Sequence, residues 1–447
     1  MSDTPPAAEA SIAYDDAPLR RFHYRVAIAS TGGVFSDGFG LGIIGTALAA
    51  AKSELVVTPL WLGLLGGASL AGLFIGALVT GPLADQFGRR RIYAYNMAVL
   101  GGLSIAQFVV DSSAALLALR IAIGFVLGTD YVVSKALLTE FTPRRYRGVV
   151  MSSLSVAWAG GFACAYAVGV ALSGEGVDAW RFMLLASAAP CLLILPFRVT
   201  MPESPLWLTD HDRGAQAAAI IRLKLGAAVR VPAPGLRDAR GRGRWRQLFS
   251  PAWRRRTLVG CAFFTCQVIP YFAVGTFVSQ VLAALNSQGG HAGGLIYNAS
   301  LLLGAVLGLV LSDRLPRRVF LIGSFSSAAA AMLLLTLLHG LSPVAMFLLF
   351  AIFAVTLSAA SNLVYVYLPE LFPTDLRASG IGLAIAASRI GSAIGTFLLP
   401  ILVAEIGVRS ALAICVGVLA LGATVGYLWA PETRGSELAG RSAGTAA

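Results

Sequence analysis

The chain alternates between long apolar stretches and short polar segments that carry most of its charged residues. Most of the apolar stretches reach the ~20 residues that a helix needs to cross a bilayer. In lipid such stretches form helices, because a helix satisfies its own backbone hydrogen bonds. The pattern predicts an all-α membrane protein with twelve transmembrane helices, at residues 25–50, 60–84, 92–110, 114–139, 148–171, 181–197, 257–285, 292–311, 319–338, 343–368, 378–402 and 409–430.

Three short polar motifs each occur twice, and the two copies of each lie almost the same distance apart. The pairs are residues 85–90 with 313–318, 140–143 with 370–373, and 202–205 with 431–434, at offsets of 228, 230 and 229 residues. A constant offset near half the chain length indicates two structurally equivalent halves. Because apolar stretches separate the motifs, both halves lie in the membrane, as in many secondary transporters.

The repeat divides the chain into five segments. These are an N-terminal tail (1–24), a first six-helix bundle (25–197), a linker (198–256), a second six-helix bundle (257–430) and a C-terminal tail (431–447). The linker is polar and rich in arginine, so we expect it to lie against anionic lipid headgroups. It has room for one or two short surface helices, one of them near residues 212–225.

Composition excludes a soluble domain, because 57% of the residues are hydrophobic and only 13% are charged. The net charge of +12 is distributed by membrane side. If the N-terminus is cytoplasmic, the arginine-rich segments share its side, and only Lys52, Arg181 and Arg409 lie on the other. This asymmetry is the positive-inside rule. It predicts a multi-pass protein of the inner or plasma membrane with both termini in the cytoplasm, and no nucleic-acid partner.

Residue types that support catalysis or metal binding are sparse. The five cysteines are an odd number, fall inside apolar stretches and lack metal-type spacing. The four histidines are scattered, and no nucleophile–base pair stands out. We therefore predict no enzyme activity, no metal site and no cofactor. A non-transporting membrane sensor is also disfavoured, because the sequence contains no large soluble domain.

The motifs resemble those of the major facilitator superfamily, in particular its sugar-porter and organic-ion branches, over essentially the whole chain. The resemblance rests on the loop signature at residues 81–90, the helix signature at 120–124, and the paired motifs at 202–205 and 431–435. A closer similarity, to bacterial proton symporters for aromatic acids and other metabolites, rests on residues 58–61, 128–131 and 387–391.

This resemblance implies two pseudo-symmetric six-helix bundles that rock about a central site. It implies a monomeric, proton-coupled symporter that imports a small organic solute, such as an aromatic acid anion, with the solute, the proton and the lipid bilayer as its partners. Two alternatives stay open: a sugar or polyol porter, and an exporter of a small metabolite. The seventh span lacks the paired glutamines typical of sugar porters, and the fifth lacks the Gly-Pro pair typical of drug/proton antiporters.

Two positions depart from the family pattern. The second copy of the loop signature has Pro316 where glycine is usual and Leu309 at the first glycine position. We therefore expect the charge cluster of the second half to be degraded. In the first span, sugar-porter-like proteins often have an acid where this chain has Gly40, and only the earlier acid, Asp37, remains.

Ionisable residues inside spans are expensive in lipid and are therefore candidates for function. Asp37 lies near the middle of the first span among glycines that permit close approach. Asp130 lies in the inner half of the fourth span, and the resemblance suggests that Arg120 acts near the coupling acid. We predict that these three residues couple transport to the proton.

Each of these assignments has a structural alternative. Asp37 could be a neutral acid hydrogen-bonded between helices. Arg120 could instead extend to the outer surface, as long cationic side chains near helix ends do. Lys135 lies near the cytoplasmic end of the fourth span, and we expect it to extend to that surface rather than to have a functional role.

Arg389 lies near the middle of the eleventh span, and its guanidinium offers a fork that matches a carboxylate. In organic-anion transporters with a similar motif, an arginine here is associated with anion recognition, so the resemblance implies that Arg389 binds the substrate. The alternative is an ion pair with an acid of the other half, such as Asp37. Aromatic and amide side chains of the seventh and tenth spans are the further substrate candidates, namely Gln267, Tyr271, Asn362 and Tyr365.

The charged motif residues lie at helix ends on one face of the membrane. We expect ion pairs between the two bundles to hold a cytoplasmic gate shut and to break on inward opening, as a two-state element that substrate and proton bias. Surplus arginines such as Arg90 only set the topology. The gate candidates are Asp85, Arg89, Glu140, Arg147, Glu203, Asp313, Glu370, Arg377 and Glu432.

Overall fold

The structure is a computed structural model that describes residues 12–51, 54–55, 58–174, 176–232, 245–285 and 290–433. It contains 12 helices long and apolar enough to cross a membrane, which confirms the predicted all-α fold. Short helices continue or precede some spans. Pro59 and Pro343 are the first residues of two of the spans, a position where the backbone N–H has no partner within the helix and its absence costs nothing.

The helices of the first half are α1 (Arg21–Ala50), α2 (Pro59–Phe87), α3 (Arg89–Ala106), α4 (Ser113–Phe141), α5 (Arg144–Leu172), and α6 (Ala179–Ala186) with α7 (Ala188–Val199), which together make the sixth span. Those of the linker are α8 (Pro205–Asp210), α9 (Gly214–Lys224) and α10 (Trp245–Leu248). Those of the second half are α11 (Arg254–Thr276), α12 (Val278–Ala284), α13 (Gly290–Arg314), α14 (Arg317–Leu337), α15 (Pro343–Ala360), α16 (Leu363–Glu370), α17 (Thr374–Ile406) and α18 (Val408–Trp429).

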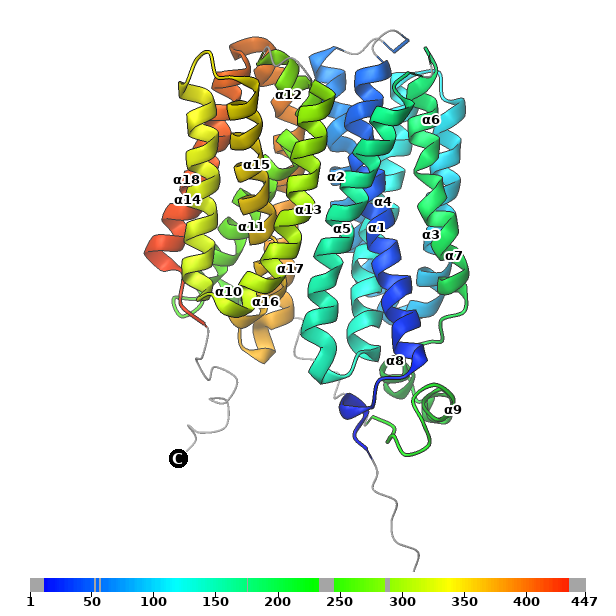
Figure 1. Ribbon diagram of the computed structural model, residues 1–447. Helices are drawn as coiled ribbons and strands as arrows, with labels where there is room; N and C mark the ends of the chain where they lie inside the picture. Colours follow the sequence, from blue (N-terminus) through cyan, green and yellow to red (C-terminus); the bar gives the residue numbers. More distant parts are fainter. Residues whose placement is uncertain are drawn as a thin grey trace, which may run out of the picture.

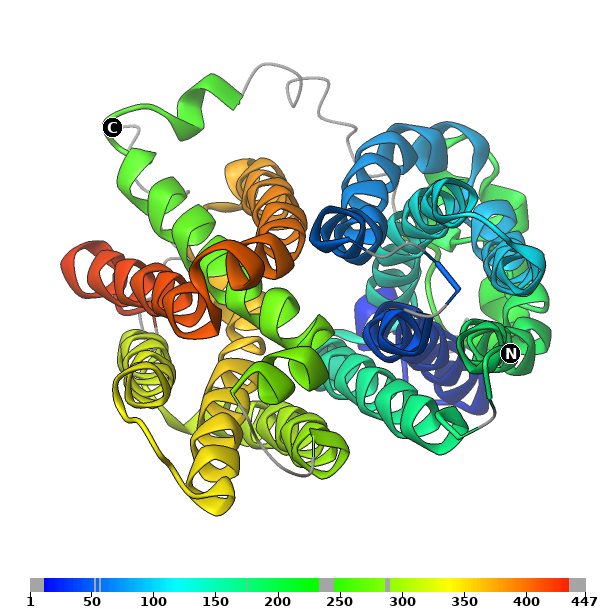
Figure 2. The ribbon, with the colours of Figure 1, turned by 90° about the horizontal axis from the view of Figure 1, so that it is seen from above.

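The helices form two bundles that lie side by side, as Figure 2 shows from one end. In the first bundle α2 packs on α4 and α1 on α5, and in the second α14 packs on α18 and α13 on α15. Between the bundles, α2 lies against α17, and α5 lies against α13. The short helices α8 and α9 lie at one end of the molecule, which we call the linker face (Figure 1).

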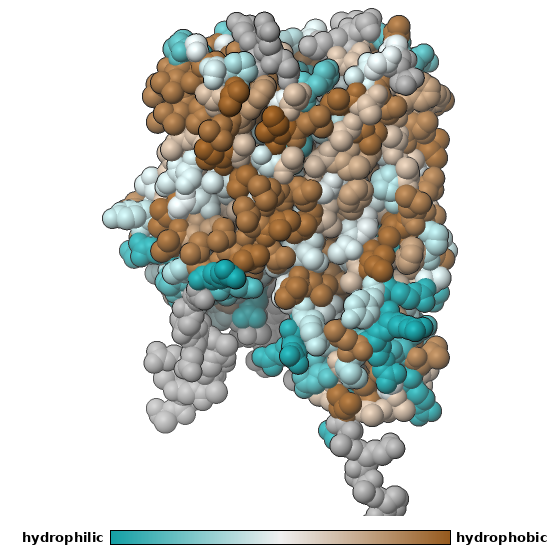
Figure 3. All heavy atoms as spheres, viewed as in Figure 1, coloured by the Kyte–Doolittle hydropathy of each residue, from teal (hydrophilic) through white to brown (hydrophobic). Residues whose placement is uncertain are grey.

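Apolar side chains cover much of the helical body, and polar ones gather towards the linker face (Figure 3). Large apolar residues such as Leu193 and Val344 are about three-quarters exposed, at 75% and 76%. Exposure of this extent on helices of membrane length is what a lipid-facing surface requires. The protein is therefore an integral, multi-pass membrane protein.

Glycines bring the two halves into backbone contact near the face opposite the linker. A Cβ at Gly45, close to the end of α1, would overlap the carbonyl oxygen of Thr276 in the second half. A Cβ at Gly63, in the first turns of α2, would overlap the carbonyl oxygen of Phe397. These positions need glycine because the backbones of the two halves meet there.

The described part of the N-terminal tail is packed against the linker face. Ile12 exchanges backbone hydrogen bonds with the linker, donating to Ala228 at 2.8 Å and accepting from Arg230 at 2.9 Å. Tyr14 donates its hydroxyl hydrogen to the carbonyl oxygen of Glu140 at 2.9 Å. The tail, the linker and the α4–α5 junction therefore form one layer. Residues 1–11, 233–244 and 434–447 of the predicted tails and linker lie outside the described residues.

Candidate functional site

Asp130 of α4 and Arg198 of α7 form an ion pair whose side chains are both 0% exposed. Arg198 Nη1 and Nη2 each bind one carboxylate oxygen, the second at 3.0 Å, and Arg198 Nε donates to the carbonyl of Ala29 at 3.2 Å. Ser134 donates to Asp130 Oδ2 at 2.9 Å, and Asn96 donates to Oδ1 at 3.3 Å. Hydrogen bonds to the remaining lone pairs offset the cost of burying both charges.

Arg198 is not among the residues predicted for the site, because the predicted linker begins at residue 198. The structure instead places this arginine in the last turn of α7, stacked 4.2 Å from the ring centroid of Tyr93. A Cβ at Gly33 of α1 would overlap Arg198 Nη2, so the glycine provides the space for the guanidinium. Two features of the sequence could have identified Arg198. Asp130 is an acid inside a span and therefore needs a cation, and the glycine pair at residues 32–33 leaves room for a large side chain.

Asp37 lies beside this pair, close enough for its carboxyl group to interact electrostatically with both Asp130 and Arg198. It is 5% exposed, and its Oδ1 has no hydrogen-bond partner among the described residues. One guanidinium balances one carboxylate, and a second buried negative charge without a partner is costly. The three side chains therefore bring two carboxyl groups and one guanidinium together inside the first half.

The structure does not bring Arg120 to these acids. Arg120 is 1% exposed, so it does not extend to the outer surface. Its Nη1 donates to the carbonyl oxygen of Gly40 at 3.1 Å. Among the described residues, no carboxylate forms an ion pair with it, and its Nε and Nη2 have no partner.

A cavity of about 80 Å³ lies between the two halves. The first half contributes α4 and α5 to it, and the second contributes α11, α16 and α17. Half of its lining is aromatic, and the rest consists of two serines, two valines, one amide and one cation: Tyr131, Ser155, Trp158, Phe264, Gln267, Val268, Tyr271, Phe272, Ser361, Val364, Tyr365 and Arg389. Ser155 and Ser361 hydrogen-bond across the two halves at 3.1 Å.

Arg389 lies in this cavity wall and is 7% exposed. Its guanidinium carbon lies 4.8 Å from the ring centroid of Tyr131 and 5.9 Å from that of Phe264. Its Nε has no hydrogen-bond partner, and no carboxylate of the described ranges forms an ion pair with it. The alternative in which Asp37 pairs with Arg389 is therefore not the arrangement seen.

Lys135 also lies between the halves, contrary to the expectation that it reaches the membrane surface. Its Nζ lies 3.3 Å from the ring centroid of Tyr131 and 4.9 Å from that of Tyr365. Tyr131 thus has two cations beside it, Lys135 and Arg389. The sequence signal was the spacing of four residues between Tyr131 and Lys135, which places them on one helix face.

The remaining substrate candidates divide into two groups. Gln267, Tyr271 and Tyr365 line the cavity, and Gln267 keeps a free Oε1 while its Nε2 donates to the carbonyl of Leu357 at 3.3 Å. Asn362 does not line it. Its side chain is 0% exposed and donates to the carbonyl of Ala305 at 3.0 Å, which ties the start of α16 to α13.

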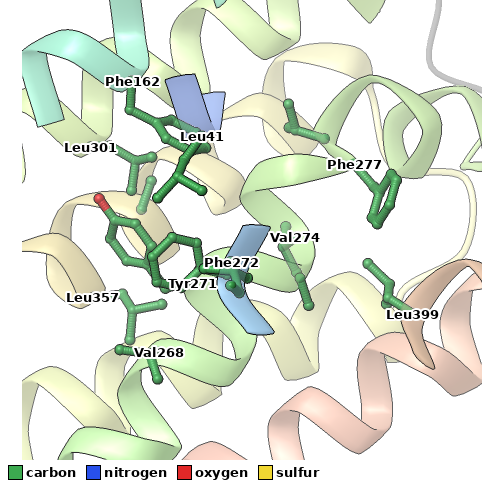
Figure 4. Close-up of a cluster of buried hydrophobic side chains, with 14 of the residues drawn as sticks. Leu41, Phe162, Val268, Tyr271, Phe272, Val274, Phe277, Leu301, Leu357 and Leu399 are labelled. Atoms are coloured by element: carbon green, nitrogen blue, oxygen red, sulfur yellow. The ribbon is translucent and has the colours of Figure 1, made fainter. Parts of the chain in front are cut away.

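An apolar cluster extends from the cavity across both halves. Figure 4 shows Tyr271 and Phe272 of α11 gathered with Phe162 of α5 and Leu41 of α1. Trp158 stacks on Phe162 at 5.2 Å and contacts both α11 aromatics at 5.6 Å. The cavity therefore has a rigid aromatic wall suited to a small ring-shaped ligand.

The charged motifs of the first half are joined at the linker face. Arg89 pairs with Glu140 and, at 3.4 Å, with Asp85. Glu203 accepts hydrogen bonds from the backbone N–H groups of Arg89 and Arg90, both at 3.1 Å, at the start of α3. Gly88 precedes that helix with φ of 92°, a conformation that favours glycine.

The second half repeats this arrangement, so the expected degradation of its charge cluster is wrong. Glu432 accepts from the backbone N–H groups of Arg317 at 2.9 Å and Arg318 at 3.0 Å, and Arg317 lies 3.5 Å from Glu370. Pro316 has φ of −57°, which suits the residue before a helix. Proline therefore replaces the usual glycine here without loss of the carboxylate contact.

Among the described residues, the ion pairs of these motifs stay within one half. Arg147 pairs with Asp15 of the N-terminal tail at 2.9 Å, and Arg377 Nε donates to the carbonyl of Pro369 at 3.1 Å. Asp313 is exposed. Within the described ranges, none of the ion pairs of these motifs joins the two bundles.

Comparison with known proteins places this geometry in context. A family model described as "Sugar (and other) transporter" matches residues 25–442. The inner membrane metabolite transport protein YgcS of Escherichia coli (strain K12) is 39% identical over 94% of both chains. The 4-hydroxybenzoate transporter PcaK of Acinetobacter baylyi is 26% identical over 87% of both chains.

The fold also matches a solved structure. The partially occluded, inward-open form of the xylose transporter XylE from E. coli superposes with a TM-score of 0.77 and 19% sequence identity. The match covers 93% of this chain and 100% of XylE. The family resemblance indicated by the sequence motifs is thereby confirmed.

Proposed function

Because the chain belongs to the sugar (and other) transporter family of the major facilitator superfamily, we propose that it is a proton-coupled symporter that imports a small organic anion. It works as a monomer in the inner or plasma membrane, with both termini in the cytoplasm. The substrate class is an aromatic or similar carboxylic acid, which moves through the central cavity by alternating access.

Arg389 is the observation that carries the substrate class. It is a buried cation in the cavity wall without a carboxylate partner among the described residues, and such a charge is costly unless an anion binds it. The aromatic wall around it favours a flat ring, and Lys135 adds positive charge beside Tyr131. PcaK, named as a transporter of 4-hydroxybenzoate, supports the same class.

Asp37, Asp130 and Arg198 provide the coupling site. With Asp37 protonated, the cluster has one negative and one positive charge. Loss of that proton adds a second buried negative charge beside a single guanidinium, which favours a different packing of α1 against α4 and α7. A proton at Asp37 can therefore bias the equilibrium between two conformations.

The positive-inside rule assigns the linker face to the cytoplasm. The halves then make their glycine-mediated contacts on the outer side, at Gly45 and Gly63, and the conformation is inward-facing. In the outward-facing state the motif residues at the linker face pair across the bundles and close the cytoplasmic gate.

A transport assay tests the substrate class. The purified protein is placed in liposomes with an acidic exterior, and uptake of labelled 4-hydroxybenzoate is compared with uptake of labelled xylose. We expect concentrative uptake of the acid that collapses with a protonophore. Uptake of xylose alone would overturn the anion assignment.

A sugar or polyol remains the second candidate. It is supported by Gln267, whose free Oε1 in the cavity suits a hydroxyl donor. The xylose arm of the same assay distinguishes the two.

A further inference from the structure

Four arginines are buried within the described membrane spans: Arg120, Arg198, Arg317 and Arg389. Arg317, the first residue of α14, has Glu370 as its counterion at 3.5 Å. Arg198 has Asp130 as its counterion, and Arg389 lines the central cavity. Arg120 has neither. Among the described residues, its guanidinium makes one hydrogen bond, to the Gly40 carbonyl, and a buried guanidinium with so little compensation is strongly unfavourable.

The two nitrogens of Arg120 without partners are Nε and Nη2. They lie on the same edge of the guanidinium, so their N–H groups point in parallel. This is the edge that grips a carboxylate or similar anion with two hydrogen bonds. The side chain therefore presents a complete anion-binding fork inside the first half, where no described carboxylate meets it.

An empty space adjoins Gly40, the residue whose carbonyl Arg120 binds. A Cβ at Gly40 would meet no heavy atom within 4 Å outside its own helix backbone. The other described glycines with such open surroundings are at least partly exposed, whereas Gly40 is buried. We call this open space at a buried residue the void, and it adjoins the residue whose carbonyl oxygen accepts the hydrogen bond of Arg120.

We propose that the unpaired edge of the Arg120 guanidinium, beside Gly40, is a second anion site, distinct from the Arg389 cavity, that binds a compact monovalent anion. The anion is chloride or a small carboxylate, which share the charge and size that the fork and the void accept. With chloride, the site is a structural or regulatory ion site that does not depend on the proposed transport function. With a carboxylate, it rests on that function and is an additional position for the transported acid.

Thermal unfolding of the purified protein in detergent tests this site without a transport measurement. Sodium chloride and sodium acetate are titrated separately, with ionic strength held by sodium gluconate. We expect one of the two to raise Tm by about 3 °C or more and to saturate, because a ligand that binds only the folded state stabilises it. A response to chloride identifies the inorganic ion, and a response to acetate identifies a carboxylate.

Gly40→Asp is the decisive variant, because it places a carboxylate in the void. We expect a higher Tm in gluconate and no further shift with chloride or acetate. Gly40→Ala adds only an uncharged methyl group. It should reduce the shift of Tm with anion, and it should not raise Tm in gluconate as Gly40→Asp does. Arg120→Gln should lose the response, and Gly40→Asp carries the test by itself if that variant does not fold.

The acetate titrations of all variants are made in the Arg389→Gln background, because the proposed function places a carboxylate site at Arg389. Arg389→Gln alone is the matched control, and it should keep the anion response that belongs to Arg120. The proposal is overturned if neither anion shifts the wild-type Tm, or if Gly40→Asp responds as the wild type does. It is also overturned if the response disappears in Arg389→Gln but persists in Arg120→Gln, because the anion then binds in the central cavity. None of these outcomes depends on whether the protein takes up 4-hydroxybenzoate.

Discussion

Arg198 holds Asp130 through both of its terminal nitrogens, and neither side chain reaches solvent. The pair joins α4 to the end of the sixth span, and the Nε bond to Ala29 adds α1 to the same joint. It therefore fixes three helices around the carboxyl group of Asp37.

Breaking this pair should destabilise the protein strongly. Arg198→Gln or Asp130→Asn leaves one charge buried without its partner, at a cost of about 3–5 kcal/mol. The double variant removes both charges and should recover part of that loss. Thermal unfolding and monodispersity in detergent measure this. Single variants as stable as the wild type would contradict the structural role of the pair.

Asp37→Asn should uncouple transport from the proton. The amide cannot take up or release the proton, so accumulation driven by a pH gradient should be lost, while exchange of substrate across the membrane continues. Asp16→Asn, at an exposed position of the N-terminal tail, is the control and should behave as the wild type. Full concentrative uptake by Asp37→Asn would exclude this carboxyl group as the coupling site.

Arg389→Lys should weaken binding of carboxylates about tenfold, because the charge remains while the two-pronged fork is lost. Arg389→Gln should weaken it further and still give a folded protein, since the arginine has no described carboxylate partner. Ligand-induced shifts in Tm measure both effects. Misfolding of Arg389→Gln, with rescue by neutralising Asp37 or Asp130, would instead identify an internal ion pair.

Gly45→Leu should shift the protein away from the inward-facing conformation. A side chain at this position would collide with the backbone at Thr276, so the halves could no longer close on the side opposite the linker. Ser361→Cys, in the cavity wall, reports the change through its accessibility to thiol reagents from each side of the membrane. Gly102→Leu, where a Cβ meets open surroundings, is the matched control. Equal labelling in both variants would show that Gly45 does not limit closure.

The sequence by itself determined the architecture. Long apolar stretches in lipid have no alternative to helices, so hydropathy and length were sufficient for the twelve spans. The repeated motifs predicted two equivalent halves, because each motif caps the same helix junction in its half. An ionisable residue in mid-span is costly in lipid, and for this reason the sequence alone identified Asp37, Asp130 and Arg389 as candidates before any contact was known.

Only the tertiary structure decided which charges meet. Arg198 and Lys135 lie near helix ends, where a side chain that extends to the surface and one that turns inward have the same sequence pattern. Asn362 was predicted to contact the substrate, but its side chain instead donates a hydrogen bond to the carbonyl oxygen of Ala305 and does not line the cavity. Which charges pair depends on how helices that are distant in the chain are rotated against one another, and packing across the whole bundle fixes that rotation. At Gly33, for example, the absence of a side chain leaves the space that the guanidinium of Arg198 occupies.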